Sequence, residues 1–293
     1  MFFSRDPLNP LLFGRPLGLA ALGTACLAVG LPWPGHFLLT VSAVLLAWLA
    51  LQLIRHRGPD LVQGPNAAYV NWAPATLFLL STTLPGRGQL VAWGFAAGVA
   101  LGLAAVGVCR WWALAATRRA VDMAVVAWTI PLTVGSIVAP PSLQVPAGLL
   151  GAVSASASAA VLLLSTWRVV RRRGTHGMRS LWYGVGGSAV LADWAVHVVP
   201  AAWLPAALVA FGLTGVFWLG AVLHAGLRTH GAWSNLFSLC STGKVLLALQ
   251  LLIEAKALFA LAGLALVLDL RATFGALRAT RLLEDRSASG AFR

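Results

Sequence analysis

Long apolar segments follow one another along almost the whole chain, each rich in Leu, Ala, Val and Gly. A helix needs about 20 mostly apolar residues to cross the roughly 30 Å hydrocarbon core of a bilayer, and these segments have about that length. Membrane β-strands are about ten residues long and alternate polar with apolar positions, a pattern that these segments lack. The pattern therefore predicts an all-α integral membrane protein.

Charged residues and Pro or Gly breaks separate ten such segments, which we expect to be ten transmembrane helices. Their predicted ranges are 13–31, 36–54, 68–84, 88–109, 121–140, 144–166, 181–199, 202–223, 234–253 and 256–275. Residues 1–293 then form a single transmembrane domain, of which 276–293 are a cytoplasmic tail.

Basic residues gather in every second predicted loop and beyond the last helix. They are Arg55, Arg57, Arg110, Arg118, Arg119, Arg168, Arg171, Arg172, Arg173, Arg179, Arg228, Arg278, Arg281 and Arg286. The intervening loops hold only Arg87, Lys256 and Glu254 as charged residues. Because loops rich in Lys and Arg stay in the cytoplasm, both termini are expected there, in the cytoplasmic (inner) membrane of a bacterium.

Helix-breaking residues concentrate in the odd-numbered predicted helices. They are Pro16, Pro74 and Pro131 in the first, third and fifth, and Gly184, Gly186 and Gly187 in the seventh. Proline frees a backbone carbonyl and kinks a helix, which membranes tolerate where neighbours or water satisfy that group. We therefore predict five helical hairpins, with odd helices forming an inner pore ring and even helices an outer ring.

Composition excludes a water-soluble protein, since 59% of the residues are hydrophobic and only 10% are charged. Soluble domains have about 25% charged residues, and the mean hydropathy here is +0.83. The net charge of +13 follows from the cytoplasmic loops, so no nucleic-acid partner is expected. Cys26, Cys109 and Cys240 show no metal-binding spacing, and neither a metal nor another cofactor is predicted.

The first predicted helix carries the sharpest motif in the chain. Residues 13–22, Phe-Gly-Arg-Pro-Leu-Gly-Leu-Ala-Ala-Leu, resemble the opening of the tellurite-resistance/dicarboxylate transporter family, which includes the slow anion channels of plant guard cells. Residues 72–76 and 130–136 are similar to the third and fifth helices of that family. Residues 233–237 resemble a Trp-x-x-x-Phe stretch of its bacterial members. Length and helix layout extend the resemblance over essentially the whole chain.

The resemblance implies transport of small anions such as chloride, nitrate, sulfite, dicarboxylates or tellurite-like oxyanions. It also implies a homotrimer whose protomers each conduct through the five inner helices. Phe237 matches the phenylalanine that occludes the pore in the family and is the candidate gate, because an apolar constriction closes by dewetting. The small residues Gly18, Gly135, Ser136, Gly187 and Ser241 are candidate pore-lining positions.

Two ionisable residues lie within odd-numbered helices, where the family usually has apolar or small polar groups. They are Asp193 in the seventh and Lys244 in the ninth. Lys244 follows Phe237 by seven residues, so both lie on nearly one helix face. Three interpretations remain open: a mutual salt bridge, snorkelling of Lys244, or a direct role on the anion path. A titratable Asp193 would also permit proton-coupled transport.

Other polar residues have simpler interpretations. His197 lies near the end of the seventh predicted helix, where it could line a vestibule, and no sequence neighbour pairs with it. Ser154, Ser156 and Ser158 are expected to allow close helix contact and not to bind a ligand.

Two competing functions can be weighed against anion transport. A drug/metabolite-type ten-helix carrier would repeat after five helices with inverted topology, whereas the irregular helices here recur every second segment. An integral-membrane enzyme would need paired carboxylates, clustered histidines or a nucleophile beside a base. The sequence shows no such set, so we predict that the chain is not an enzyme. Channel and carrier remain alternatives.

Overall fold

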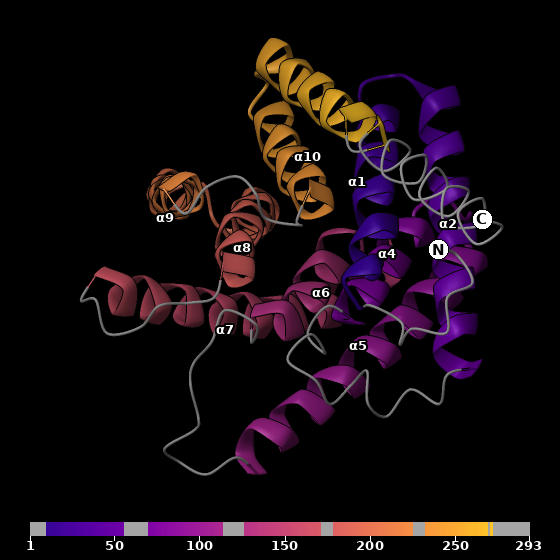
Figure 1. The fold of residues 1–293 in the computed structure, drawn as a ribbon, viewed down its shortest axis with the longest axis horizontal. Coiled ribbons are helices and arrows are strands. Elements are labelled where there is room, and N and C mark those ends of the chain that lie inside the picture. Colours follow the sequence, from indigo (N-terminus) through magenta and orange to yellow (C-terminus); the bar gives the residue numbers. More distant parts are fainter. Residues whose placement is uncertain are drawn as a thin grey trace, which may run out of the picture.

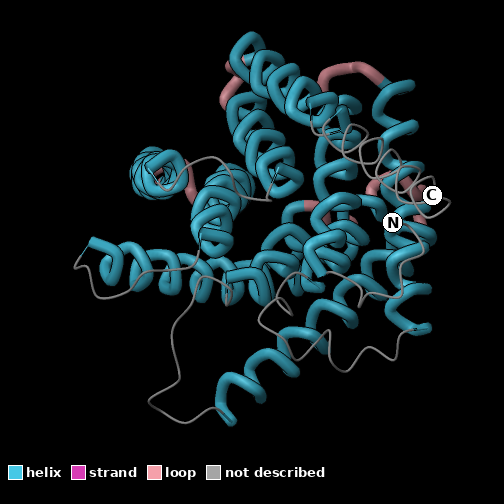
Figure 2. Tube along the Cα trace, viewed as in Figure 1, coloured by secondary structure: helices cyan, strands magenta, loops and turns pink. Residues whose placement is uncertain are grey.

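The structure is a computed structural model that describes residues 10–55, 70–113, 126–170, 178–224, 232–268 and 270–271. Throughout these ranges the regular structure is helical, without a strand (Figure 2). This confirms the predicted all-α class. The predicted tail 276–293 and most of the basic links lie outside the described residues.

The α-helices of the described chain follow the order of the predicted segments. They are α1 (Gly14–Ala28), α2 (Pro32–Arg55), α4 (Trp72–Ser81), α5 (Arg87–Ala113), α6 (Val126–Ile137), α7 (Gln144–Val170), α8 (Met178–Val198), α9 (Leu204–His224), α10 (Ala232–Ala248) and a last helix at 252–268. Two 3₁₀ turns, Pro10–Phe13 and Pro141–Leu143, precede α1 and α7.

The end of α10 differs from the predicted range 234–253. The helix stops at Ala248 because Gln250 adopts a left-handed backbone conformation with φ of 64°. The N–H of Leu251 donates to the carbonyl of Leu246 at 2.8 Å, and that of Gln250 donates to Leu247 at 3.0 Å. This is the hydrogen-bond pattern of a Schellman cap, usually completed by glycine. The sequence has no glycine or proline here, so apolar periodicity alone missed the turn.

Helices that are neighbours in the chain pack as pairs, namely α1 with α2, α4 with α5, α6 with α7, and α8 with α9. The first pair is joined by Gly30, whose φ of 81° suits glycine. The last helix, 252–268, packs on α10, since the ring of Phe259 lies against the backbone of Gly243.

Five helices contact one another in a closed order: α1, α4, α6, α8, α10 and back to α1 (Figure 1). Their partners α2, α5, α7 and α9 lie beside this five-helix ring. Figure 1 shows α1 and α2 running side by side, α7 running across that direction and α9 seen end-on. The pairs are therefore inclined to one another and do not form a parallel bundle.

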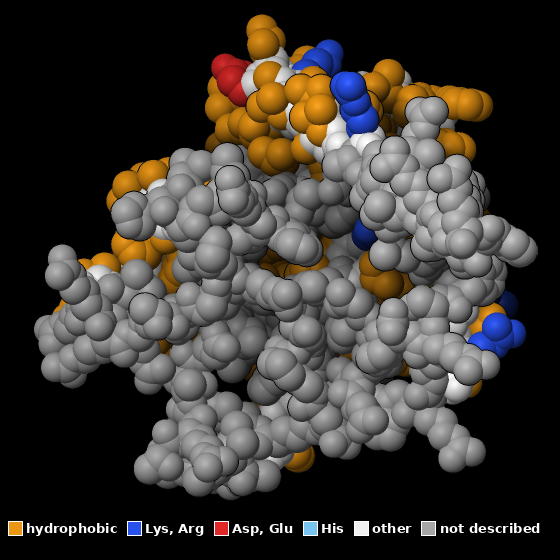
Figure 3. Space-filling model, viewed as in Figure 1, with side chains coloured by type: hydrophobic (Ala, Val, Ile, Leu, Met, Phe, Trp, Pro, Cys, Tyr) orange, Lys and Arg blue, Asp and Glu red, His pale blue; other side chains and the backbone are white. Residues whose placement is uncertain are grey.

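Exposure of apolar side chains separates the two sets of helices. Exposed large hydrophobic side chains occur on α2, α5, α7, α9 and the last helix, 252–268. Among the described side chains of the ring helices, Val198 is the only exposed large hydrophobic one. Figure 3 shows such side chains at the rim of the visible face. Within the part of the chain that the structure describes, four segments are long and apolar enough to span a membrane: Pro32–Arg55, Arg87–Cys109, Pro141–Trp167 and Leu204–Ala221. All four belong to the partner helices and not to the ring.

Candidate functional site

Asp193 is a buried ionisable residue in the last third of α8, one of the five ring helices. It is 5% exposed, and its carboxylate oxygen Oδ1 has no hydrogen-bond partner. Buried carboxylates normally accept several hydrogen bonds, since they can only accept when ionised. Within the described structure, the other buried side-chain polar atoms without a hydrogen-bond partner are Asn71 Oδ1, Ser165 Oγ and Trp194 Nε1, so Asp193 is the one such residue with an ionisable side chain.

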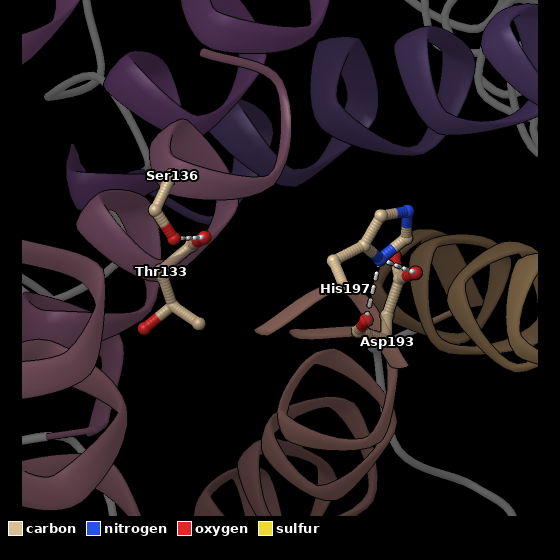
Figure 4. Close-up of polar contacts among 4 residues, drawn as sticks. All are labelled: Thr133, Ser136, Asp193 and His197. Carbon is tan, nitrogen blue, oxygen red and sulfur yellow. Dashed lines mark hydrogen bonds and ion pairs between the residues drawn. The ribbon is translucent and has the colours of Figure 1, made fainter. Parts of the chain in front are cut away.

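His197 stands one helical turn after Asp193 on α8 and contacts it twice (Figure 4). Its Nδ1 lies 2.8 Å from the backbone carbonyl oxygen of Asp193 and 3.6 Å from Oδ1. The carbonyl only accepts, so Nδ1 carries the proton, and Nε2 is left to take up a second one. The side chain is 45% exposed. The sequence interpretation of His197 as a residue without a partner was therefore wrong, and its i, i+4 spacing from Asp193 was the overlooked signal.

Lys244 lies on α10, which packs directly against α8. A positive charge on Lys244, and one on His197 when its ring is protonated twice, would act on Asp193 through space. The ion pair of Asp193 among the described residues is with His197, not with Lys244. The three side chains thus form a mixed-charge cluster across two adjacent ring helices.

The candidate gate Phe237 is buried in the main apolar cluster and is 7% exposed. Ser241 follows Phe237 by four residues and Lys244 follows it by seven, which places all three on one face of α10. Ser241 is buried and Lys244 is half-buried. The candidate gate Phe237 and the basic residue Lys244 therefore lie on the same side of α10.

Gly135 and Ser136 lie on α6 and make contacts that the sequence did not indicate. The ring of Phe78 from α4 lies so close to Gly135 that a Cβ there would collide with it. Trp93 of α5 donates from Nε1 to the carbonyl oxygen of Gly135 at 2.8 Å. Ser136 donates to the carbonyl of Thr133 in its own helix at 2.8 Å (Figure 4). Gly135 is thus a packing point of three helices.

The remaining predicted residues have clear positions in the ring. Gly18 in α1 and Gly187 in α8 are buried. Pro131 lies inside α6. Pro16 and Pro74 are each the third residue of α1 and α4, where the missing N–H group costs no intrahelical hydrogen bond.

The three serines of α7 differ in whether they face the neighbouring helix α6. Ser154 and Ser158 are buried against α6, and Ser156 is exposed. Ser154 hydrogen-bonds to Thr133 at 2.9 Å and to the carbonyl of Thr129, while Ser158 bonds to the hydroxyl of Thr129. The prediction that the serines serve helix contact is confirmed for Ser154 and Ser158.

A cavity of about 530 Å³ lies outside the ring, between α2, α4 and α5. Its walls include Leu39, Leu77, Leu80 and Ala92, with His36 among the polar residues. It shares none of the residues of the Asp193 cluster. In comparisons with known protein families and with characterised proteins, the chain matches no family and no individual protein.

Proposed function

We propose that this chain conducts small anions across a membrane along the axis of the five-helix ring. The observation that carries the proposal is the division between the helices. The partner helices expose large apolar side chains, as a lipid environment requires, whereas the ring helices hold the cluster of Asp193, His197 and Lys244. Ionisable residues inside a membrane protein mark substrate or ion pathways.

In this proposal the ten helices cross the bilayer as five hairpins, with both termini in the cytoplasm of a bacterium. The closed contact order of the ring helices supports the arrangement. The resemblance of residues 13–22 to the tellurite-resistance/dicarboxylate transporter family supports the choice of anions. Phe237 is then the gate and Lys244 the cation that attracts anions toward it. By the same resemblance, three copies assemble and each conducts independently.

The decisive experiment is an anion flux measurement on the purified protein in liposomes. We expect chloride, nitrate, sulfite or dicarboxylate to cross faster than in empty liposomes. The flux of K⁺, measured as the cation control, should not increase. Equal leakage of every anion in protein-containing and empty liposomes would contradict anion transport. Chemical cross-linking in the membrane, followed by mass determination, tests the trimer.

A proton-coupled carrier is a second candidate, favoured by the contact between Asp193 and His197. A histidine with a free Nε2 beside a buried carboxylate is a combination found in proton relays. Such a carrier would accumulate anions when an inward proton gradient is imposed at zero voltage. A passive channel would only equilibrate them.

Enzymatic activity has little support at the same cluster. An Asp–His pair acts in catalysis when the histidine activates a nucleophile within hydrogen-bond reach. Among the described residues, the hydrogen bond of the His197 ring is to the backbone of Asp193. We therefore keep the proposal of a transport protein without catalytic residues.

A further inference from the structure

The Oδ1 atom of Asp193 lacks a hydrogen-bond donor although the residue is 5% exposed. An ionised carboxylate can only accept hydrogen bonds, and leaving it buried without a donor is unfavourable. The site is therefore short of one donor. A ligand that supplies an O–H or N–H group would correct this.

The two basic neighbours, His197 and Lys244, do not supply that donor. His197 Nδ1 is 3.6 Å from Oδ1, beyond hydrogen-bond distance, and its proton points to the backbone carbonyl of Asp193 at 2.8 Å. Lys244 lies on α10, which packs directly against α8, and among the described residues the salt-bridge contact of Asp193 is with His197 and not with Lys244. Lys244 has three donors and no acceptor. The cluster thus presents Oδ1 of Asp193, an acceptor without a donor, beside the half-buried Lys244, whose ammonium group can only donate.

A monovalent oxyanion that keeps one O–H group matches both. Its O–H would donate to Oδ1 of Asp193, and its charged oxygen would accept from Nζ of Lys244. Chloride and nitrate carry the same charge but no hydrogen, so they would meet the carboxylate with lone pairs only. A fully deprotonated dianion would be repelled more strongly still.

We propose that the Asp193–Lys244 cluster selects monovalent oxyanions bearing one O–H group, a class that includes bicarbonate, hydrogen sulfite and singly protonated dicarboxylates. This inference rests on the proposed anion path and specifies its substrate. Asp193 acts as the discriminating acceptor and Lys244 as the counter-charge. His197 lies beside the carboxylate on the same helix, with Nδ1 3.6 Å from Oδ1.

Bicarbonate and nitrate provide a matched pair for the test. Both are planar monoanions with three oxygens around a central atom, and only bicarbonate has an O–H. With bicarbonate on one side of a planar bilayer and nitrate on the other, the reversal potential gives their permeability ratio directly. We expect the parent protein to favour bicarbonate.

The Asp193→Asn variant should lower the bicarbonate-to-nitrate ratio by at least about tenfold, the effect of one hydrogen bond to a charged group. The amide removes the repelling charge and adds a donor that nitrate can use. Glu254→Gln is the matched control, because Glu254 is an exposed carboxylate outside the cluster. Its ratio should equal that of the parent.

A parent ratio at or below one overturns the inference, and so does an unchanged ratio in a folded Asp193→Asn variant. If that variant does not fold, the parent ratio still decides. If no anion carries current, the proposed function fails. The thermal unfolding temperature of the purified parent protein, measured with each anion, then tests whether the cluster binds bicarbonate in preference to nitrate. Greater stabilisation by bicarbonate than by nitrate at equal ionic strength supports the site, and equal stabilisation rejects it.

Discussion

At the scale of single residues, the most informative feature is the pairing of Asp193 with His197 instead of Lys244. Within α8, Nδ1 of His197 hydrogen-bonds to the backbone carbonyl of Asp193 and lies 3.6 Å from its carboxylate oxygen Oδ1. Among the described residues, Lys244 on α10 makes no salt bridge with Asp193. The mutual salt bridge is therefore not formed between these two side chains, and a role of Lys244 on the anion path stays a prediction.

Lys244→Gln should reduce anion conductance without loss of expression. A unit charge about 8 Å from an anion changes its energy by about 2 kcal/mol at an effective dielectric constant of 20. That corresponds to a fall in conductance of roughly tenfold or more, measurable as single-channel current in planar bilayers. Lys256→Gln is the control, since Lys256 is exposed on the last helix. Normal conductance in folded Lys244→Gln would remove Lys244 from the path.

Phe237→Ala should raise anion conductance, because removal of an apolar ring widens and wets a constriction. Phe259→Ala is matched in residue type and burial, both phenylalanines being 7% exposed. Phe259 packs against Gly243 from outside the ring, so its loss should lower stability by about 3–5 kcal/mol without increasing current per channel. Unchanged current in Phe237→Ala at equal surface expression would exclude the gate.

At the scale of helices, small and hydroxyl-bearing residues determine which faces meet. Gly135 admits the ring of Phe78, and Ser154 and Ser158 join α7 to α6 through hydroxyl hydrogen bonds. Membrane helices associate through such close contacts because lipid provides no hydrophobic force between them. Among the described residues, α6 is thus joined to α7 and α4 by close packing and hydroxyl hydrogen bonds.

The α6–α7 contact can be tested with three matched serines on one helix. Ser154→Ala and Ser158→Ala should each lower the free energy of unfolding by about 0.6–1.7 kcal/mol, the range for hydrogen bonds between membrane helices. Ser156→Ala should leave it unchanged, because Ser156 is exposed. Chemical denaturation in mixed micelles measures all three. Equal losses for the three serines would contradict the assigned faces.

At the scale of the whole molecule, the closed order of α1, α4, α6, α8 and α10 leaves outside it the four described helices that are long and apolar enough to span a membrane. Only 6% of the apolar window of α9 is buried. Such a surface would aggregate in water, so a lipid environment explains it best. The arrangement of all ten helices in one bilayer follows from the loop charges and remains part of the proposal.

Orientation can be measured with single cysteines in a cysteine-free background. A cysteine in place of Trp33, Gly86 or Trp203 should react with an impermeant maleimide added outside intact cells. One in place of Arg57, Arg172 or Arg228 should react only after permeabilisation. Labelling of both groups from the same side would contradict the alternating hairpins.

The sequence by itself determined the all-α class, the order of the helices and the residues worth testing, because apolar length and charge spacing are local properties. It placed Asp193 and Lys244 in odd-numbered helices, and these helices are the ones in the ring. It missed the cap at Gln250, since a left-handed residue other than glycine leaves no compositional signal.

Only the tertiary structure decided which side chains meet. The contact of Phe78 and Trp93 with Gly135, the choice of His197 as partner of Asp193, and the closure of α10 onto α1 join residues through three-dimensional packing. Such contacts depend on side-chain direction and helix crossing, and spacing along one helix does not specify these. For the same reason, the unpartnered oxygen of Asp193, on which the proposed anion selectivity rests, becomes visible only in the folded chain.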